Sequence, residues 1–190
     1  MRKDSARTLL TATQVASFCQ VDLKTIHNWA DKKAILHHRT PGRHLRFRRL
    51  DVVDFLRAYG YPIPDDLRKQ RPKLVIVHSE PVVLSALRRA LSRRFELTTY
   101  GDPFDALVGL TALEPDALVL DLGFLAFDGI RCIERLAANP ATRHIRIVAL
   151  GPDDMARAPI LSAGAAGFVR SADALDLRDV LDRVIGLDGA

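Results

Sequence analysis

Apolar side chains recur at intervals of three and four residues in the first part of the chain, as they do in amphipathic helices. A capping box formed by Thr11 and Gln14 predicts the start of one helix. Asp22 is suited to cap a second helix, which we expect to end near Lys32. A third helix is predicted from Asp51, because apolar residues return there at helical spacing.

The segment between the second and third helices has a different pattern. Residues 35–49 predict two strands joined by a tight turn at Pro41 and Gly42. This hairpin would carry Arg43 and His44 at its tip. Short helices followed by such a hairpin form a winged helix-turn-helix, so we predict a small α(+β) domain over residues 1–58.

Short apolar runs alternate with helical patterns in the rest of the chain. The runs cover residues 73–77, 97–100, 117–120, 145–150 and 167–169. Regular alternation of strands and helices predicts a parallel sheet covered by helices on both faces. We therefore predict an α/β, flavodoxin-like domain over residues 73–190, with five strands in the order 2-1-3-4-5.

The stretch 59–72 separates these two patterns. It contains Pro62 and Pro64 and then a charged run, a composition that is typical of linkers. We therefore expect two domains joined by a linker at residues 59–72.

Charge is divided unevenly between the two parts. Residues 1–72 contain 15 Lys and Arg against 7 Asp and Glu, a net charge of +8. Residues 73–190 contain 13 against 16, a net charge of −3. A basic first domain favours a polyanionic partner for that domain alone, although a solvated basic face without a ligand would give the same count.

The two cysteines indicate a reducing compartment. Cys19 and Cys132 lie in different domains, each within an apolar helical pattern, as reduced core cysteines do. The N-terminus lacks the apolar core of a signal peptide, and no apolar run approaches the length of a membrane span. We expect a cytoplasmic protein that does not contact the membrane.

The second helix and the hairpin supply candidate contacts to duplex DNA. A helix fits the major groove, where Lys, Thr and Asn can bond base edges, and arginines on a hairpin suit phosphates and a narrow minor groove. On the helix the candidates are Lys24, Thr25, His27 and Asn28. On the hairpin they are Arg39, Arg43, His44, Arg46 and Arg48.

The segment from Leu10 to Leu56 resembles the winged helix-turn-helix domains of the MerR superfamily and of excisionases. The resemblance is carried by L-T-x-x-x-V-A at its start, by Trp29, and by T-x-G-x-H-x-R-F at residues 40–47. It implies a recognition helix at residues 23–32 and a wing at residues 41–44. Lys33 departs from the family pattern, because a glycine commonly ends the recognition helix. No long coiled-coil helix follows, which puts dimerisation in the MerR manner in doubt.

Residues 73–187 resemble the receiver domain of response regulators. Asp121 matches the phosphoacceptor aspartate, Glu80-Pro81 the opening of the first helix, and Asp128-Gly129 the usual downstream pair. Four further positions depart from the pattern. His78 and Ser79 replace two acidic residues that help hold Mg²⁺, and Gly151 replaces a Ser or Thr. The usual lysine falls at Ser171 or at Arg170.

These departures predict a pseudo-receiver that is not phosphorylated in the ordinary way, with Asp121 as a retained strand-end residue. Non-standard phosphorylation of Asp121 is the alternative. By resemblance, residues 153–187 would form a homodimer interface or contact a protein partner. A phosphorylation-gated response regulator and an adaptor that senses a small ligand or partner are the other hypotheses for the whole chain.

No cofactor, metal site or enzymatic activity is predicted. Neither a G-x-S-x-G elbow, an H-E-x-x-H helix nor a Walker-type phosphate loop occurs. The histidines of the first domain lack the spacing of zinc ligands. These residues are His27, His37, His38 and His44.

Overall fold

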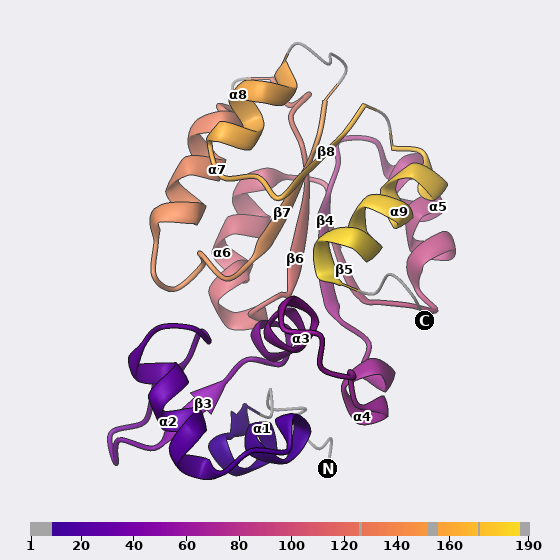
Figure 1. Ribbon diagram of the computed structural model, residues 1–190. Helices are drawn as coiled ribbons and strands as arrows, with labels where there is room; N and C mark the ends of the chain where they lie inside the picture. The colour runs from indigo at the N-terminus through magenta and orange to yellow at the C-terminus, as the bar shows by residue number, and fades with distance from the viewer. Residues whose placement is uncertain (1–8, 126, 152–155, 171, 187–190) are drawn as a thin grey trace, which may run out of the picture. The chain divides into compact units, whose positions relative to one another are not determined.

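The structure is a computed structural model that describes residues 9–125, 127–151, 156–170 and 172–186 (Figure 1). The chain divides into two compact units, Met1–Gln70 and Arg71–Ala190. Each unit has a separate cluster of buried apolar side chains.

Over residues 9–70, the N-terminal unit combines four helices with a small antiparallel sheet, in the order β1-β3-β2. Its elements are β1 (Leu10–Thr11), α1 (Ala12–Cys19), α2 (Leu23–Asp31), β2 (His38–Arg39), β3 (Leu45–Phe47), α3 (Arg49–Ala58) and α4 (Asp65–Lys69). The predicted hairpin corresponds to β2 and β3, in which His38 is paired with Arg46. Strand β1 joins the other edge of β3 by pairing Leu10 with Phe47, which the sequence did not indicate.

Both predicted helix caps are confirmed. The Thr11 hydroxyl accepts from the backbone N–H of Gln14 at 3.2 Å, and the Gln14 side chain accepts from the backbone N–H of Thr11 at 2.9 Å. The carboxylate of Asp22 accepts from the backbone N–H of Thr25 at 2.6 Å. Hydrogen bonding with Thr25 lowers the pKa of Asp22, because it stabilises the charged carboxylate.

Part of the predicted linker belongs to the N-terminal core. Leu67 of α4 is buried with the core residues, and Tyr61 and Ile63 pack against them. The Tyr61 ring lies 6.4 Å from the rings of both Trp29 and Phe55, measured between centroids. The chain therefore folds back on α2 and α3 before it enters the second unit.

The C-terminal unit has the predicted flavodoxin-like receiver fold. Its elements are β4 (Lys73–Val77), α5 (Pro81–Leu91), β5 (Glu96–Tyr100), α6 (Pro103–Leu113), β6 (Ala117–Asp121), α7 (Gly129–Ala138), β7 (Arg146–Leu150), α8 (Arg157–Ser162), β8 (Gly167–Val169) and α9 (Ala174–Ile185). All neighbouring strands are parallel, in the order β5-β4-β6-β7-β8. This order is the predicted 2-1-3-4-5.

Alternating side chains bury both faces of the parallel sheet. In β4, Val75 and Val77 join a buried cluster with residues of α6, α7 and α8. Leu74 and Ile76, which point to the opposite face, are also buried. In Figure 1, α6, α7 and α8 lie on one side of the sheet, and α5 and α9 on the other. Residues that follow β4, β6 and β7 therefore meet at one edge of the sheet.

Candidate nucleic-acid interface and receiver pocket

Helix α2 has one apolar and one polar face, as its sequence predicts. Ile26 and Ala30 are buried, whereas Lys24 and Asn28 are exposed. Thr25 and His27, two further candidates for DNA contact, are half-buried. This leaves an amide and an ammonium group facing solvent on one side of the helix, where they could bond base edges or phosphates.

Lys33 ends α2 in a conformation that usually selects glycine. Its φ angle is 57°, in the left-handed region. The N–H of Lys33 donates to the carbonyl of Ala30 and that of Ala34 to the carbonyl of Trp29, both at 2.9 Å. This pair of bonds is a Schellman motif, so the backbone geometry of the family pattern is present although the glycine is not.

A lysine side chain is thereby held, exposed, directly beside the polar end of α2. Sequence reasoning noted Lys33 only as a departure and did not include it among the DNA-binding candidates. The signal that could have revealed Lys33 as a candidate is its positive charge, at a position where glycine would adopt the backbone conformation at a lower free-energy cost.

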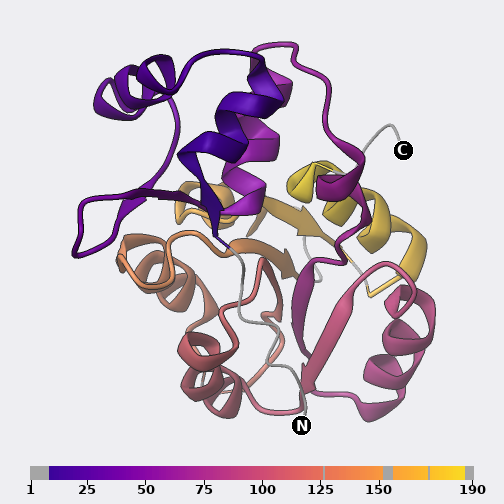
Figure 2. The same cartoon turned by 90° about the horizontal axis from the view of Figure 1, so that it is seen from below.

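The tip of the hairpin is closed by three hydrogen bonds around Thr40. Its N–H donates to the carbonyl of His44 at 3.0 Å, and its carbonyl accepts from the N–H of Arg43 at 2.7 Å. Its hydroxyl accepts from the N–H of His44 at 3.2 Å. The left-handed residue of this turn is Arg43, with φ 61°, rather than Gly42. In Figures 1 and 2 the hairpin extends as a loop from the body of the N-terminal unit.

Three of the hairpin arginines already form hydrogen bonds or ion pairs with neighbouring groups of the protein. The guanidinium of Arg39 lies 2.8 Å from the carboxylate of Asp31 on α2, and both side chains are partly open to solvent. Arg48 donates to the His38 ring at 3.2 Å. Arg46 is half-buried and donates to the carbonyl of Leu45 at 2.9 Å.

Arg43, His44 and Lys24 are exposed and have no acidic partner within the described residues. The described candidate side chains of this unit therefore fall into two groups. One group is exposed and uncommitted, and the other is held in place by neighbours. The link between Asp31 and Arg39 was not predicted, because nothing in the sequence relates two residues eight positions apart on different elements.

The receiver edge contains Asp121 at the end of β6, close to Ser79, which follows β4. The Asp121 side chain is 13% exposed. One carboxylate oxygen accepts from the N–H of Gly123 at 2.8 Å. The other lies 3.5 Å from the N–H of Ser79 and 3.4 Å from its hydroxyl. Neutral donors thus surround the carboxylate.

His78 lies beside Asp121 without a hydrogen bond to it. Its Nδ1 atom is 3.8 Å from the carboxylate, too far for a hydrogen bond. The same nitrogen accepts from the backbone N–H of Glu80 at 3.0 Å. In this arrangement Nδ1 is an acceptor toward Glu80 and not a donor toward Asp121.

An aromatic ring lies close to Gly151, the position where a Ser or Thr was expected. Gly151 is buried at the end of β7. A Cβ atom at this position would lie 3.0 Å from Cε2 of Phe168, on the neighbouring strand β8. Arg170 is exposed just after β8, and Ser171 lies outside the described residues. Of the predicted pocket residues, the structure therefore brings His78 and Ser79 to Asp121, while Phe168 covers Gly151.

The described part of the chain contains neither a cluster of metal ligands nor a membrane-spanning helix. No group of three or more His, Cys, Asp or Glu side chains is arranged to hold a metal ion among residues 9–125, 127–151, 156–170 and 172–186. No helix in these ranges has the length and apolarity needed to cross a membrane.

Comparisons with known proteins relate each unit to a separate class. Residues 9–59 match the family described as "Helix-turn-helix domain". The transcriptional regulatory protein PrrA of Mycobacterium leprae (strain TN) is 35% identical over 68 residues, which are 35% of this chain and 29% of PrrA. The match thus spans less than a third of that relative. The N-terminal unit contains a helix-turn-helix region.

Solved receiver domains share the fold of the C-terminal unit. The signal receiver domain of a DNA-binding response regulator (merR) from Colwellia psychrerythraea 34H is 22% identical, with a TM-score of 0.54 and coverage of 60% of this chain and 98% of that one. The chemotaxis response regulator CheY4 of Vibrio cholerae is 18% identical, with a TM-score of 0.55 and coverage of 60% and 99%.

The receiver domain of the sensor histidine kinase PA1611 from Pseudomonas aeruginosa PAO1 is 24% identical, with a TM-score of 0.52 and coverage of 62% and 99%. That structure has a magnesium ion in its active-site cleft. At these levels of identity, the three likenesses establish the fold alone.

Proposed function

We propose that this chain is a sequence-specific, DNA-binding transcription regulator of the MerR or excisionase-like kind. The single observation that carries the proposal is Arg43, an exposed cation at the tip of the hairpin, in a backbone conformation that favours glycine. A left-handed φ is less favourable for arginine than for glycine, and the guanidinium at this exposed tip therefore supports contact with a polyanion.

In this proposal α2 enters the major groove and the hairpin contacts phosphates and the adjacent minor groove. Asn28 can bond an adenine edge with both polar atoms of its amide, and Lys24, Thr25 and His27 supply further contacts. Arg43 and His44 reach the minor groove or its phosphates. Arg39, Arg46 and Arg48 lie on or beside the strands of the hairpin and contribute positive charge closer to its base.

Enrichment of random duplexes on the full chain at stated salt concentration tests this proposal. The expected result is one enriched motif whose affinity falls steeply between about 50 and 200 mM salt. Asn28→Ala should relax preference at one or two base pairs, whereas Arg43→Ala and Arg46→Ala should weaken all duplexes alike. Arg89→Ala, an exposed arginine of the second unit, is the charge-matched control. Absence of any bound duplex in dilute buffer would refute the proposal.

We further propose that the receiver unit acts without phosphorylation. His78 and Ser79 supply no carboxylate, so the residues present do not fit Mg²⁺, a hard cation that prefers carboxylate oxygens. The ring of Phe168 would lie only 3.0 Å from a Cβ atom at residue 151, so a side chain there would be crowded. The carboxylate of Asp121 accepts hydrogen bonds from Gly123 and Ser79 instead.

Intact mass measurement after incubation with acetyl phosphate and Mg²⁺ tests this second proposal. The wild type should gain no phosphoryl group, and Asp121→Asn should behave identically. An Asp121-dependent gain of one phosphoryl group would instead favour the phosphorylation-gated alternative, which the position of Asp121 at the end of β6 supports.

The face formed by α8, β8 and α9, within residues 153–187, is the proposed site of homodimerisation or of contact with a protein partner. Leu161 and Leu175 are exposed on its helices, which supports this role. A dimer would double the DNA contacts and raise avidity. Sedimentation of the wild type and of Leu175→Lys should show a dimer that the substitution weakens. A wild type that remains monomeric at all concentrations would exclude a homodimer.

A further inference from the structure

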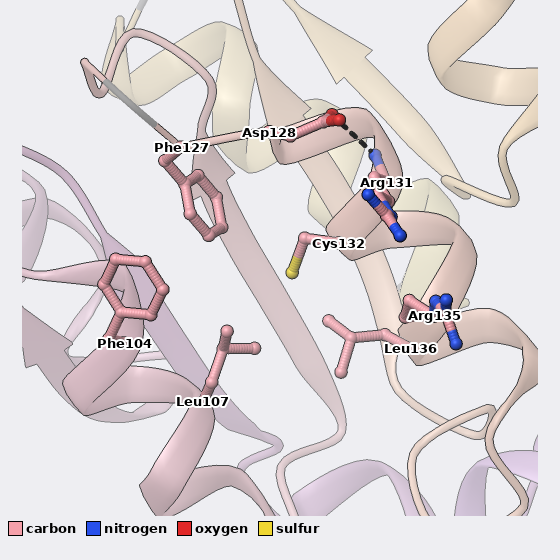
Figure 3. A pocket seen from close by; sticks show the side chains of 8 residues that line it. All are labelled: Phe104, Leu107, Phe127, Asp128, Arg131, Cys132, Arg135 and Leu136. Carbon is pink, nitrogen blue, oxygen red and sulfur yellow. Dashed lines mark hydrogen bonds between the residues drawn. The ribbon is translucent and has the colours of Figure 1, made fainter.

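A groove lies between α6 and α7, on the face of the sheet opposite α5 and α9 (Figure 3). The volume of the groove is about 340 Å³, and the groove is wide open to solvent. Its floor and walls are largely apolar, formed by Phe104, Leu107, Phe127, Cys132 and Leu136. The Phe104 and Phe127 rings meet edge to face, with their centroids 5.7 Å apart. Predictions from the sequence did not involve this site.

The outer surface of α6 continues the apolar character of the groove. Phe104 is 60% exposed and Val108, one turn later, is 82% exposed. Asp105 is the one charged residue in the helix. A helix on the surface of a soluble protein normally turns a polar face to water, and one that is apolar all round is normally covered. The apolar surface of α6 is thus unusual for a helix at the outside of the unit.

The opposite rim of the groove is cationic. Arg131 and Arg135 are exposed one turn apart on α7, and neither has a carboxylate partner within the described residues. The nearby carboxylate of Asp128 caps α7 by accepting from the backbone N–H of Arg131 at 2.9 Å. Burial, and to a lesser extent Asp128, raise the pKa of the Cys132 thiol to about 11, so the groove floor is uncharged at neutral pH.

We propose that this groove binds an acidic amphipathic helix of a partner protein. Apolar side chains of that helix would lie on Phe104, Val108 and the groove floor. Two of its carboxylates, three or four residues apart, would face Arg131 and Arg135, whose spacing they match.

Two observations favour a helix over a small ligand or nucleic acid. A small ligand is usually enclosed over most of its surface, whereas this groove is open and continues onto the exposed side of α6. Nucleic acid would need cations distributed along the length of the groove to contact successive phosphates, whereas the two arginines that line this groove lie one turn apart on a single rim. The proposal depends neither on DNA binding nor on the face within residues 153–187.

Selection from a display library of helical peptides, each of about 16 residues, tests the proposal with the full chain as target. One face of each peptide is randomised among Leu, Phe, Ala, Glu and Lys. Counter-selection against the double variant Arg131→Glu/Arg135→Glu removes peptides that bind the basic N-terminal unit. The variant Arg89→Glu/Arg93→Glu changes the charge equally at two exposed arginines elsewhere and is the control.

The expected peptides combine Leu or Phe with two Glu residues three or four positions apart. By fluorescence anisotropy, an enriched peptide should bind the groove variant at least about tenfold more weakly than the wild type and the control. Phe104→Ala and Val108→Ala, both at exposed positions, should each weaken it severalfold. A peptide with Lys in place of Glu should prefer the groove variant.

Three outcomes would overturn the proposal. The first is a library without enrichment, and the second is enrichment without excess Glu or with equal binding to the groove variant. The third is self-association of the chain that Arg131→Glu/Arg135→Glu abolishes in sedimentation, because the occupant would then be a second copy.

Discussion

The N-terminal unit exposes polar side chains at its candidate DNA-binding surface, whereas neutral donors and an aromatic ring lie around the candidate pocket of the receiver unit. Lys24, Asn28 and Arg43 face solvent in the first unit. At the edge of the second unit, His78 accepts from the backbone N–H of Glu80, and the Phe168 ring lies close to Gly151. Both units nevertheless retain well-buried cores. The difference shows that an apolar pattern maintains a fold independently of the few edge residues that determine its chemistry.

Removal of a buried ring from one unit tests how independent the two are. Phe47→Ala should lower the unfolding free energy of the N-terminal unit by about 3–5 kcal/mol, because Phe47 is fully buried in its core. Urea unfolding monitored by Trp29, the single tryptophan, reports this unit alone. Phe95→Ala, at an equally buried position of the receiver unit, should leave the Trp29 transition unchanged. A shift of that transition by Phe95→Ala would mean that the units unfold together.

Restoring a hydroxyl side chain at the receiver edge tests whether that edge is closed. Gly151→Thr should destabilise the receiver unit by about 1–3 kcal/mol, because its Cβ would lie 3.0 Å from the Phe168 ring. Thermal unfolding followed by circular dichroism measures the change. Phe168→Leu should relieve it in the double variant, and a fully stable Gly151→Thr would show that the ring moves freely.

Glycine at the hairpin tip separates stability from binding. Arg43→Gly should weaken DNA binding about tenfold while leaving the thermal stability equal or higher, because glycine accepts the left-handed φ of this position. Gln20→Gly is the control, since Gln20 has a φ of 54° and carries no charge. Fluorescence anisotropy and thermal unfolding of the same samples give both quantities. Unchanged DNA affinity would remove the main support for the proposed function.

Release of a paired arginine should change DNA affinity in the direction opposite to Arg43→Gly. In Asp31→Asn the guanidinium of Arg39 loses its partner, and a negative charge leaves the surface of α2. We expect DNA affinity to rise about two- to fivefold and its salt dependence to steepen, since one more cation can contact phosphate. Asp105→Asn, which removes an exposed carboxylate from the receiver unit, should change neither quantity. A loss of affinity would indicate that Asp31 positions Arg39 for DNA.

The smallest expected effect concerns acid stability. The folded-state pKa of Asp22 is lowered, so its contribution to stability is complete above the unfolded-state value of about 4 and is lost as the pH falls through the folded-state value. Asp22→Asn keeps a good capping residue that does not titrate. Trp29-monitored unfolding between about pH 6 and 3 should therefore be less pH-dependent in this variant. Identical pH profiles would contradict the assignment.

Local and periodic features of the structure were predictable from the sequence. The caps at Thr11 and Asp22 depend on residues three positions apart, and both form as predicted. Regular alternation predicts a doubly wound parallel sheet, and the order 2-1-3-4-5 of the receiver unit is one of the two common orders of such sheets. The candidate side chains Lys24, Asn28 and Arg43 are exposed, as DNA contact would require.

Features that depend on tertiary contact were not predictable. Strand β1 has two residues, too few to give a periodic signal, and it forms only by pairing with β3. Leu67 follows a proline-rich stretch typical of linkers, yet it is buried in the N-terminal core. In the hairpin, hydrogen bonds to Thr40 assign the left-handed conformation to Arg43, although glycine precedes it.

The packing of Phe168 against Gly151 has a consequence for timing. A phosphoryl mark persists after the kinase has left, so an ordinary receiver remembers a stimulus for as long as the acyl phosphate survives. If the receiver unit acts without phosphorylation, as proposed above, and residue 151 is crowded by Phe168, the unit would store no such mark. Its output would follow the momentary concentration of whatever binds the unit and would end when that molecule dissociates.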